Sequence, residues 1–162
     1  QIGAPSPAAV TEDVAVGLDG KLTETGRITI SDLDNGEAAF RTVVEAGAGD
    51  KGQLTLAADG AYSYSVANSA VQYLGAGQTQ VDTFVIKTID GTAKTLSFTI
   101  TGVNDAPVAV DDAFSGNEDT VITGDVTPGT PGQDRDIDGD TIRVVDADGN
   151  ALRDGECQQK KV

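Results

Sequence analysis

Apolar and polar residues alternate in short runs over the first hundred residues, and turn signals separate these runs at close intervals. The runs 53–56 and 62–66 follow a period of two and flank the pair Asp59-Gly60. Aspartate and glycine both tolerate the positive φ that a tight hairpin turn requires. The pattern therefore predicts an antiparallel β-hairpin over residues 53–66.

A second, longer hairpin is predicted further along the chain. The alternating runs 82–89 and 94–101 flank Asp90-Gly91. One set of side chains can face a common core while threonines and lysines face outward, as a half-buried antiparallel sheet requires. The residues expected in that core are Phe84, Ile86, Leu96, Phe98 and Ile100.

The remaining segments complete an all-β pattern. Further β-like runs occupy 27–30 and 39–44. The segment 68–74 predicts a single helical turn that is capped by Asn68 or Ser69 and ended by Gly75. Twenty glycines, an aromatic content of 4% and many threonines and valines are typical of a turn-rich β protein.

The charge of the chain narrows the range of functions. The 162 residues include 26 Asp and Glu against 11 Lys and Arg, a formal net charge of −15, and no His. Without His, a Ser-His-Asp triad, a Cys-His pair, a His-ligated zinc and a His-held haem are excluded. So negative a chain disfavours nucleic acid and anionic membranes as partners, and no apolar run is long enough for membrane insertion.

The single cysteine and the first residues of the chain each support one expectation. Cys157 is the sole cysteine, so no internal disulfide can form, and we expect this residue to lie in a loose tail. The chain begins at Gln1 and its first residues lack the pattern of a signal peptide. We expect it to be a piece of a longer protein.

Two short motifs recur in the same order. Glu12-Asp13-Val14 is echoed by Glu118-Asp119-Thr120, and the acidic run 32–36 is echoed by 136–140. The offsets, 106 and 104 residues, predict a tandem repeat of about one hundred residues. We expect a complete β module over 1–106, then a linker and the incomplete start of a second module over 107–162. Because that segment is about half the length of a module, we expect it to be partly disordered or to pair with another chain.

The sharpest chemical motif is the Asp-rich segment 134–140, which contains Asp134, Asp136, Asp138 and Asp140 around Gly139. Alternating carboxylates with a glycine at the bend can surround a hard cation with oxygen ligands. An EF-hand is excluded, because its twelfth position is Val145 and β-like residues replace the exit helix. A calcium site outside that class and a hairpin turn that binds nothing remain the two interpretations. Asp32 and Asp34 form a weaker version of the motif.

Other acidic residues give weaker indications of a catalytic or metal site than the segment 134–140. Paired carboxylates could serve a glycoside hydrolase, but such a site normally needs an aromatic cleft, and the chain has 3 Tyr, 4 Phe and no Trp. Asp111, Asp112, Asp146 and Asp148 are interpreted as solvated turn residues. The alternative for the first two is a contact with a metal.

Several ordered motifs resemble a known family. The segments 52–56, 59–64, 70–77 and 82–84, together with the ending 98–107, resemble a VCBS repeat. Such repeats occur in tandem arrays in large bacterial surface adhesins and in related calcium-dependent exported proteins. The resemblance covers most of residues 8–107. Residues 108–152 resemble the opening of another cadherin-like or VCBS-type repeat.

The resemblance implies a Greek-key β-sandwich of the immunoglobulin and cadherin kind, with calcium near the junctions between modules. It assigns Glu12 to the start of the first module, Asn104 and Asp105 to the linker, and Asp136 and Asp138 to the loop of the next module. Asp32 and Asp34 would serve a preceding module. The weaker candidates are Asp82, Asp90, Asp134 and Asp140.

Three hypotheses for function follow. The first is a non-enzymatic, calcium-stiffened spacer of a secreted or surface-bound bacterial adhesin, whose partners are neighbouring repeats of the same chain and whose role is adhesion or biofilm formation. The second is a recognition module that binds a carbohydrate or a protein through loops at one end of the sandwich, using Tyr62, Tyr64, Tyr73 or Arg41. The third is an accessory β-domain of an exported hydrolase.

Overall fold

The computed structural model describes residues 1–4, 8–31, 38–110, 113, 115–121 and 134–142. The chain divides into two compact units, Gln1–Asn104 and Asp105–Val162. We call these the first and the second unit. The division falls two residues before the predicted end of the first module at residue 106.

The described residues of the first unit form seven strands and one short 3-10 helix. The strands are β1 (Ala9–Thr11), β2 (Lys21–Arg27), β3 (Glu45–Ala46), β4 (Gly52–Leu56), β5 (Ala61–Ala67), β6 (Thr79–Lys87) and β7 (Ala93–Thr101). The 3-10 helix η1 (Asn68–Ala70) follows β5 directly. No helix in the described part of the chain has the length and apolar character needed to cross a bilayer.

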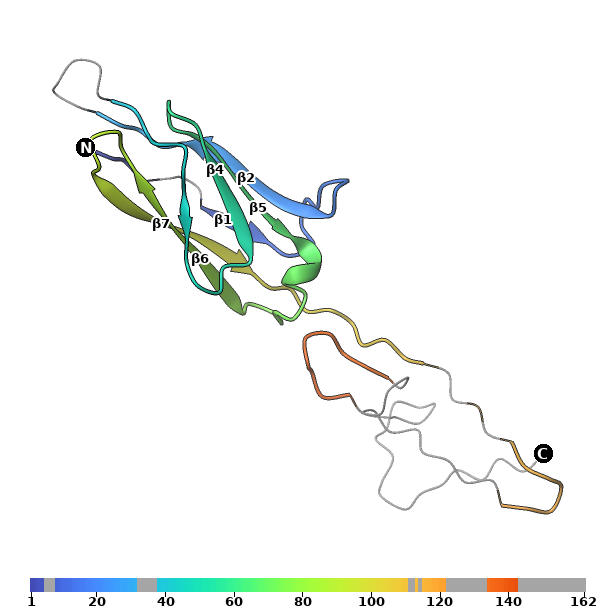
Figure 1. Cartoon of the computed structure of the whole chain (residues 1–162). Coiled ribbons are helices and arrows are strands. Elements are labelled where there is room, and N and C mark those ends of the chain that lie inside the picture. The colour runs from blue at the N-terminus through green and yellow to red at the C-terminus, as the bar shows by residue number, and fades with distance from the viewer. Residues whose placement is uncertain (5–7, 32–37, 111–112, 114, 122–133, 143–162) are drawn as a thin grey trace. The chain divides into compact units, whose positions relative to one another are not determined.

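The strands form two sheets that pack face to face (Figure 1). One sheet has the order β1-β7-β6-β3 and the other has the order β2-β5-β4. Strand β1 runs parallel to β7, whereas the other pairs are antiparallel. Most connections cross from one sheet to the other, which is the Greek-key arrangement of immunoglobulin-like sandwiches. The predicted fold class is therefore confirmed.

Both predicted hairpins are present. Strands β4 and β5 pair antiparallel around Asp59-Gly60, and β6 and β7 pair around Asp90-Gly91. The glycines of the two turns have φ of 87° and 94°, a conformation that is costly for any residue with a Cβ. All five residues that were expected in the core of the second hairpin are buried.

The structure differs from two of the predicted strands. The run 27–30 begins where β2 ends, because the Ile28 amide donates to Gly60 O and Ile30 forms an isolated bridge with Ile2. The run 39–44 contributes an isolated bridge between Phe40 and Thr88, and the regular strand β3 comes only after it. Ile28 and Phe40 are nevertheless buried, so the apolar pattern located core residues rather than strand boundaries.

The predicted cap of the helical turn is wrong. The residue at the N-cap of η1 is Ala67, and no side chain caps the helix. Asn68 uses its side chain elsewhere: Oδ1 accepts from the Asp13 amide at 3.0 Å, and Nδ2 donates to Asp13 Oδ1 at 2.6 Å. The side chain of Asn68 thus contacts a residue far away in the sequence and does not cap the helix.

An aromatic cluster fills the space between the sheets. Tyr64 is fully buried at its centre and stacks on Phe98, with ring centroids 4.5 Å apart and planes 7° apart. Phe84 meets both rings edge-on. The alternation of β5 points Tyr62, Tyr64 and Val66 inward and small residues outward. These aromatic pairs hold the two sheets together beyond the burial of their area.

Asp82 is a fully buried carboxylate on β6 that connects the two sheets. Its Oδ2 accepts from the Tyr64 hydroxyl at 2.8 Å and from the Gly52 amide at 2.6 Å, and its Oδ1 accepts from the Lys51 amide at 3.0 Å. Tyr64 and Gly52 belong to the opposite sheet. A buried carboxylate is tolerated only when donors of this kind replace water.

Gly52 makes this arrangement possible. A Cβ on Gly52 would lie 2.5 Å from the Tyr64 ring, so only glycine lets the ring pass and deliver its hydroxyl to Asp82. The start of β4, the centre of β5 and the start of β6 therefore meet at one buried carboxylate.

We predict that Asp82→Ala lowers the free energy of unfolding by about 3 kcal/mol or more, because the substitution leaves several buried donors without an acceptor. Tyr64→Phe removes one of these bonds and should cost about 1.5–3 kcal/mol. In urea denaturation, the two effects should be clearly non-additive in a double-mutant cycle. Additive effects would contradict a direct coupling through the hydroxyl.

The same contact predicts an alkaline limit to stability. Burial, followed by the hydrogen bond to Asp82, raises the pKa of the Tyr64 hydroxyl far above its usual value near 10. The folded state then holds the phenolic proton while the unfolded state releases it, so stability falls as the pH rises above about 10. Melting curves between pH 8 and 11.5 should show a smaller alkaline loss for Tyr64→Phe than for the wild-type chain.

Candidate metal centre

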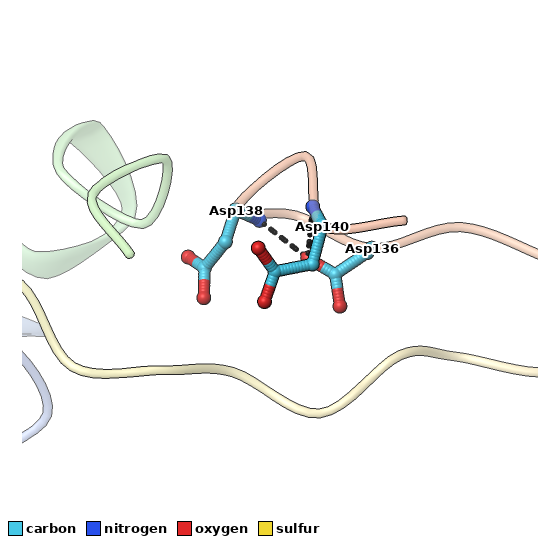
Figure 2. A group of neighbouring side chains, drawn as sticks. All are labelled: Asp136, Asp138 and Asp140. Carbon is cyan, nitrogen blue, oxygen red and sulfur yellow. Dashed lines mark hydrogen bonds between the residues drawn. The ribbon is translucent and has the colours of Figure 1, made fainter. Parts of the chain in front are cut away.

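Three carboxylates of the second unit point to the same side of one loop (Figure 2). Asp136, Asp138 and Asp140 each offer one oxygen atom, and these oxygens lie within 4.8 Å of one another. The loop is shaped by Asp136, whose Oδ1 accepts from the amides of Asp138 at 3.0 Å and Asp140 at 3.2 Å. Gly139 supplies the bend with φ of 78°. We call this segment, Asp136–Asp140, the aspartate loop.

The electrostatics of the aspartate loop are unfavourable without a cation. At a separation of 4.8 Å each pair of charges repels by about 1 kcal/mol in water and by about 3.5 kcal/mol at an effective dielectric constant of about 20. Within the described residues no amine or guanidinium forms a salt bridge with any of the three carboxylates. A bound cation would turn this repulsion into attraction.

The two carboxylate oxygens of Asp138 differ in their hydrogen bonding. Its Oδ2 accepts from the Asp105 amide at 2.7 Å. Its Oδ1 is buried, and no donor among the described residues reaches it. Buried carboxylate oxygens nearly always have a partner, so an unpaired one needs an explanation such as an ion. The donor set, made of carboxylate oxygens alone, fits a hard cation such as Ca²⁺.

The structure places the neighbouring predicted ligands less directly. Asp105 contacts the aspartate loop through its backbone amide, and its carboxylate is not one of the three clustered groups. Asp134 Oδ1 accepts from the Val110 amide at 2.8 Å, beside an isolated bridge between Val108 and Arg135. Asp134 thus fixes the start of the loop. Asn104 belongs to the first unit.

Glu12 is fully buried where β1 ends in the first unit. Its Oε1 accepts from Gln72 Nε2 at 2.8 Å, and its Oε2 accepts from the Val103 amide at 3.3 Å. The same Gln72 nitrogen donates to Asp13 Oδ1 at 2.9 Å. Two carboxylates therefore share one side-chain amide at this end of the sandwich.

Sequence reasoning missed Asp13, Asn68 and Gln72 as members of this group. A signal existed for Asp13, because the Glu-Asp pair recurs at 118–119. The structure adds that both aspartates have positive φ, 56° at Asp13 and 64° at Asp119. In both turns the amide after the aspartate donates to the carbonyl three residues earlier, at 3.3 and 3.2 Å. The recurring motif therefore folds into the same turn twice.

The two weaker candidates in the first unit have structural partners. Asp82 is the buried carboxylate between the sheets. Asp90 accepts from the Thr88 hydroxyl, from the Thr92 amide at 2.9 Å and from the Thr92 hydroxyl at 3.1 Å. These bonds, led by the one from Thr88, lower the pKa of the Asp90 carboxyl. Asp90 thus closes the β6–β7 turn, which is the alternative role that a turn position suggests.

Several predicted residues lie outside the described part of the chain. They are Asp32 and Asp34 of the weaker acidic motif, the solvated pairs Asp111, Asp112, Asp146 and Asp148, the strand-like residues 143–145, and Cys157. The predictions made for them remain predictions.

The two-sheet sandwich and the aspartate loop define a class, the structural β-sandwich modules of the cadherin and immunoglobulin kind. Residues 4–102 match the family described as bacterial cadherin-like domain, and residues 104–159 match the bacterial Ig domain. The first match covers more than half of the chain, and the chain belongs to the bacterial cadherin-like domain family. No curated protein matches the chain.

These matches confirm the cadherin-like resemblance and refine it. The second segment matches a bacterial Ig domain, whereas the sequence led us to expect another cadherin-like or VCBS-type opening. Domains of both families are typical of extracellular surface proteins and are typically non-enzymatic. Cadherin-like domains generally bind calcium. The acidic cluster of the aspartate loop lies in the segment that matches the bacterial Ig domain.

Proposed function

We propose that this chain is a calcium-stiffened structural module of a bacterial surface or secreted adhesin, and that it contributes length and rigidity rather than chemistry. Two consecutive family matches, 4–102 and 104–159, support a tandem arrangement in which each module is a neighbour of the next. The partners of the module are then the adjacent repeats of its own chain.

The observation that supports calcium most directly is the buried, unpaired Oδ1 of Asp138 within a group of three carboxylates. Ca²⁺ takes six to eight oxygen ligands with flexible geometry. Asp136, Asp138 and Asp140 would supply the charged ligands, and backbone carbonyls or water would supply the rest. Affinity in the range of extracellular modules, with a Kd of about 0.1–1 mM, is sufficient outside a cell.

Calcium would act on the segment that leads into the second unit. Asp138 already holds the Asp105 amide, one residue after the first unit ends. Without a cation, repulsion among the three carboxylates weakens the loop that makes this contact. With a cation, the loop becomes a fixed point for the linker, and the angle between consecutive modules varies less.

The recognition-module hypothesis has less support in the structure. Tyr62 and Tyr64 are core residues with exposures of 4% and 0%, so they offer no surface to a ligand. Tyr73 is 43% exposed, with the Lys51 ammonium 5.7 Å from its ring centroid. One exposed aromatic among the described residues is less than the clustered anchors that binding surfaces usually have.

The test is a calcium titration of the whole chain by isothermal calorimetry, paired with small-angle X-ray scattering in calcium and in chelator. We expect saturable binding with a Kd of about 0.1–1 mM and a narrower distribution of particle dimensions when calcium is present. Asp136→Asn combined with Asp138→Asn should abolish both effects.

A matched control is available in the same unit. Glu118→Gln combined with Asp119→Asn also removes two negative charges, and asparagine tolerates the positive φ at that position. This control should bind calcium as the wild-type chain does. Equal loss in both double variants would mean that general charge attracts calcium, and the proposed site would be wrong. Binding without any change in scattering would leave a calcium site but contradict the stiffening function.

A further inference from the structure

The end of the first unit contains an amide where a cation would be expected. Glu12 and Asp13 are adjacent in sequence, and both direct a carboxylate oxygen at Gln72 Nε2, at 2.8 and 2.9 Å. An amide nitrogen has two hydrogens, so it can donate one to each carboxylate. Asn68 Nδ2 adds a further donor to Asp13 at 2.6 Å. Neutral amides thus satisfy two neighbouring negative charges.

The fold fixes the position of Gln72. The residue lies between Val71 and Leu74, which are core residues with exposures of 0% and 4%. The Leu74 amide donates to Val71 O at 3.0 Å, which closes the turn that contains Gln72. The backbone of Gln72 is therefore anchored from both sides, and its side chain can hold the carboxylates at a constant distance.

The same carboxylate reaches the point where the chain leaves the sandwich. Up to Gly102 the chain is held by close packing, since a Cβ at that residue would lie 2.1 Å from Leu74 O. The side chain of Val103 is 37% exposed, so packing holds it much less. The Val103 amide donates to Glu12 Oε2 at 3.3 Å. Glu12 thus connects the exit of the chain to Gln72.

We propose that Gln72 is a positioning residue whose side-chain amide takes the place of a cation at this end of the first unit. It holds Glu12 and Asp13 together, and through Glu12 it fixes the course of the chain at Val103. The first unit therefore holds, without calcium, the residue at which the chain leaves it. This inference is independent of calcium binding at the aspartate loop.

The test is amide hydrogen exchange measured by NMR on the whole chain in the presence of a chelator. The Val103 amide reports the contact with Glu12. The Thr99 amide, which donates to Ala8 O at 2.9 Å within the sandwich, serves as the internal reference. In the wild-type chain, we expect protection at Val103 to be the same in chelator and in 10 mM calcium.

Gln72→Met keeps the approximate size of the side chain and removes the donor. We expect exchange at Val103 to become at least tenfold faster while exchange at Thr99 is unchanged. Gln72→Glu should have the same effect in chelator, because it places a third carboxylate beside two others, and calcium should partly restore protection. Gln53→Glu adds the same charge on an exposed position of β4 and should change neither amide.

Three results would overturn the proposal. One is wild-type protection at Val103 that exists only with calcium, because a cation rather than the amide would then hold the carboxylates. Another is unchanged exchange at Val103 in Gln72→Met. The third is equal acceleration at Val103 and Thr99 in that variant, which would mean that Gln72 supports the whole sandwich and not the chain exit. A failure of calcium to bind the aspartate loop would alter none of these outcomes.

Discussion

An excess of carboxylates is the constraint on which this structure depends. With 26 acidic and 11 basic residues, 15 negative charges have no cationic counterpart in the chain, and no histidine can help. The first unit meets this constraint with neutral donors. Asp82 accepts hydrogen bonds from a tyrosine hydroxyl and from backbone amides. Asp50 accepts from the amides of Gly47 and Thr83, and Glu12 accepts from a glutamine side-chain amide. Apart from the local bond between Gly47 and Asp50, these bonds join segments far apart in the sequence, so acids that could destabilise the sandwich instead connect it.

Among the described residues of the second unit, hydrogen-bond donors reach only some of the carboxylate oxygens. Asp136 uses backbone amides of its own loop, and Asp134 uses the amide of Val110. Asp138 keeps one buried oxygen that no described donor reaches, close to two other carboxylates. Among the residues that the structure describes, the two units therefore differ in how completely their carboxylates are hydrogen-bonded. Under the proposed function, this difference locates the cation: where amides satisfy the carboxylates a cation would add little, and where they do not it would complete the structure.

Much of the fold could be predicted from the sequence, because its signals are local. Asp-Gly pairs between alternating runs located both hairpins, and inward-facing positions such as Phe84 and Phe98 followed from a period of two. Strand ends were harder to predict. Strand β2 ends where the Ile28 amide donates to Gly60 O, and Gly60 lies in the turn between β4 and β5, far away in the sequence. The aspartate loop was visible as a motif, and Glu12 was visible through the family resemblance. Gln72, Asn68 and the buried role of Asp82 were not, because their partners are 18 to 60 residues away.

We propose that calcium binds the carboxylates that the protein itself leaves unsatisfied. The most direct measurement is a calcium titration of the whole chain followed by amide NMR shifts, residue by residue. We expect saturable shifts at Asp105 and at residues 136–140, with no shift at Glu12, Asp13 or Gln72. Shifts at Glu12 and Gln72 that saturate together with, or before, those of the aspartate loop would contradict this proposal.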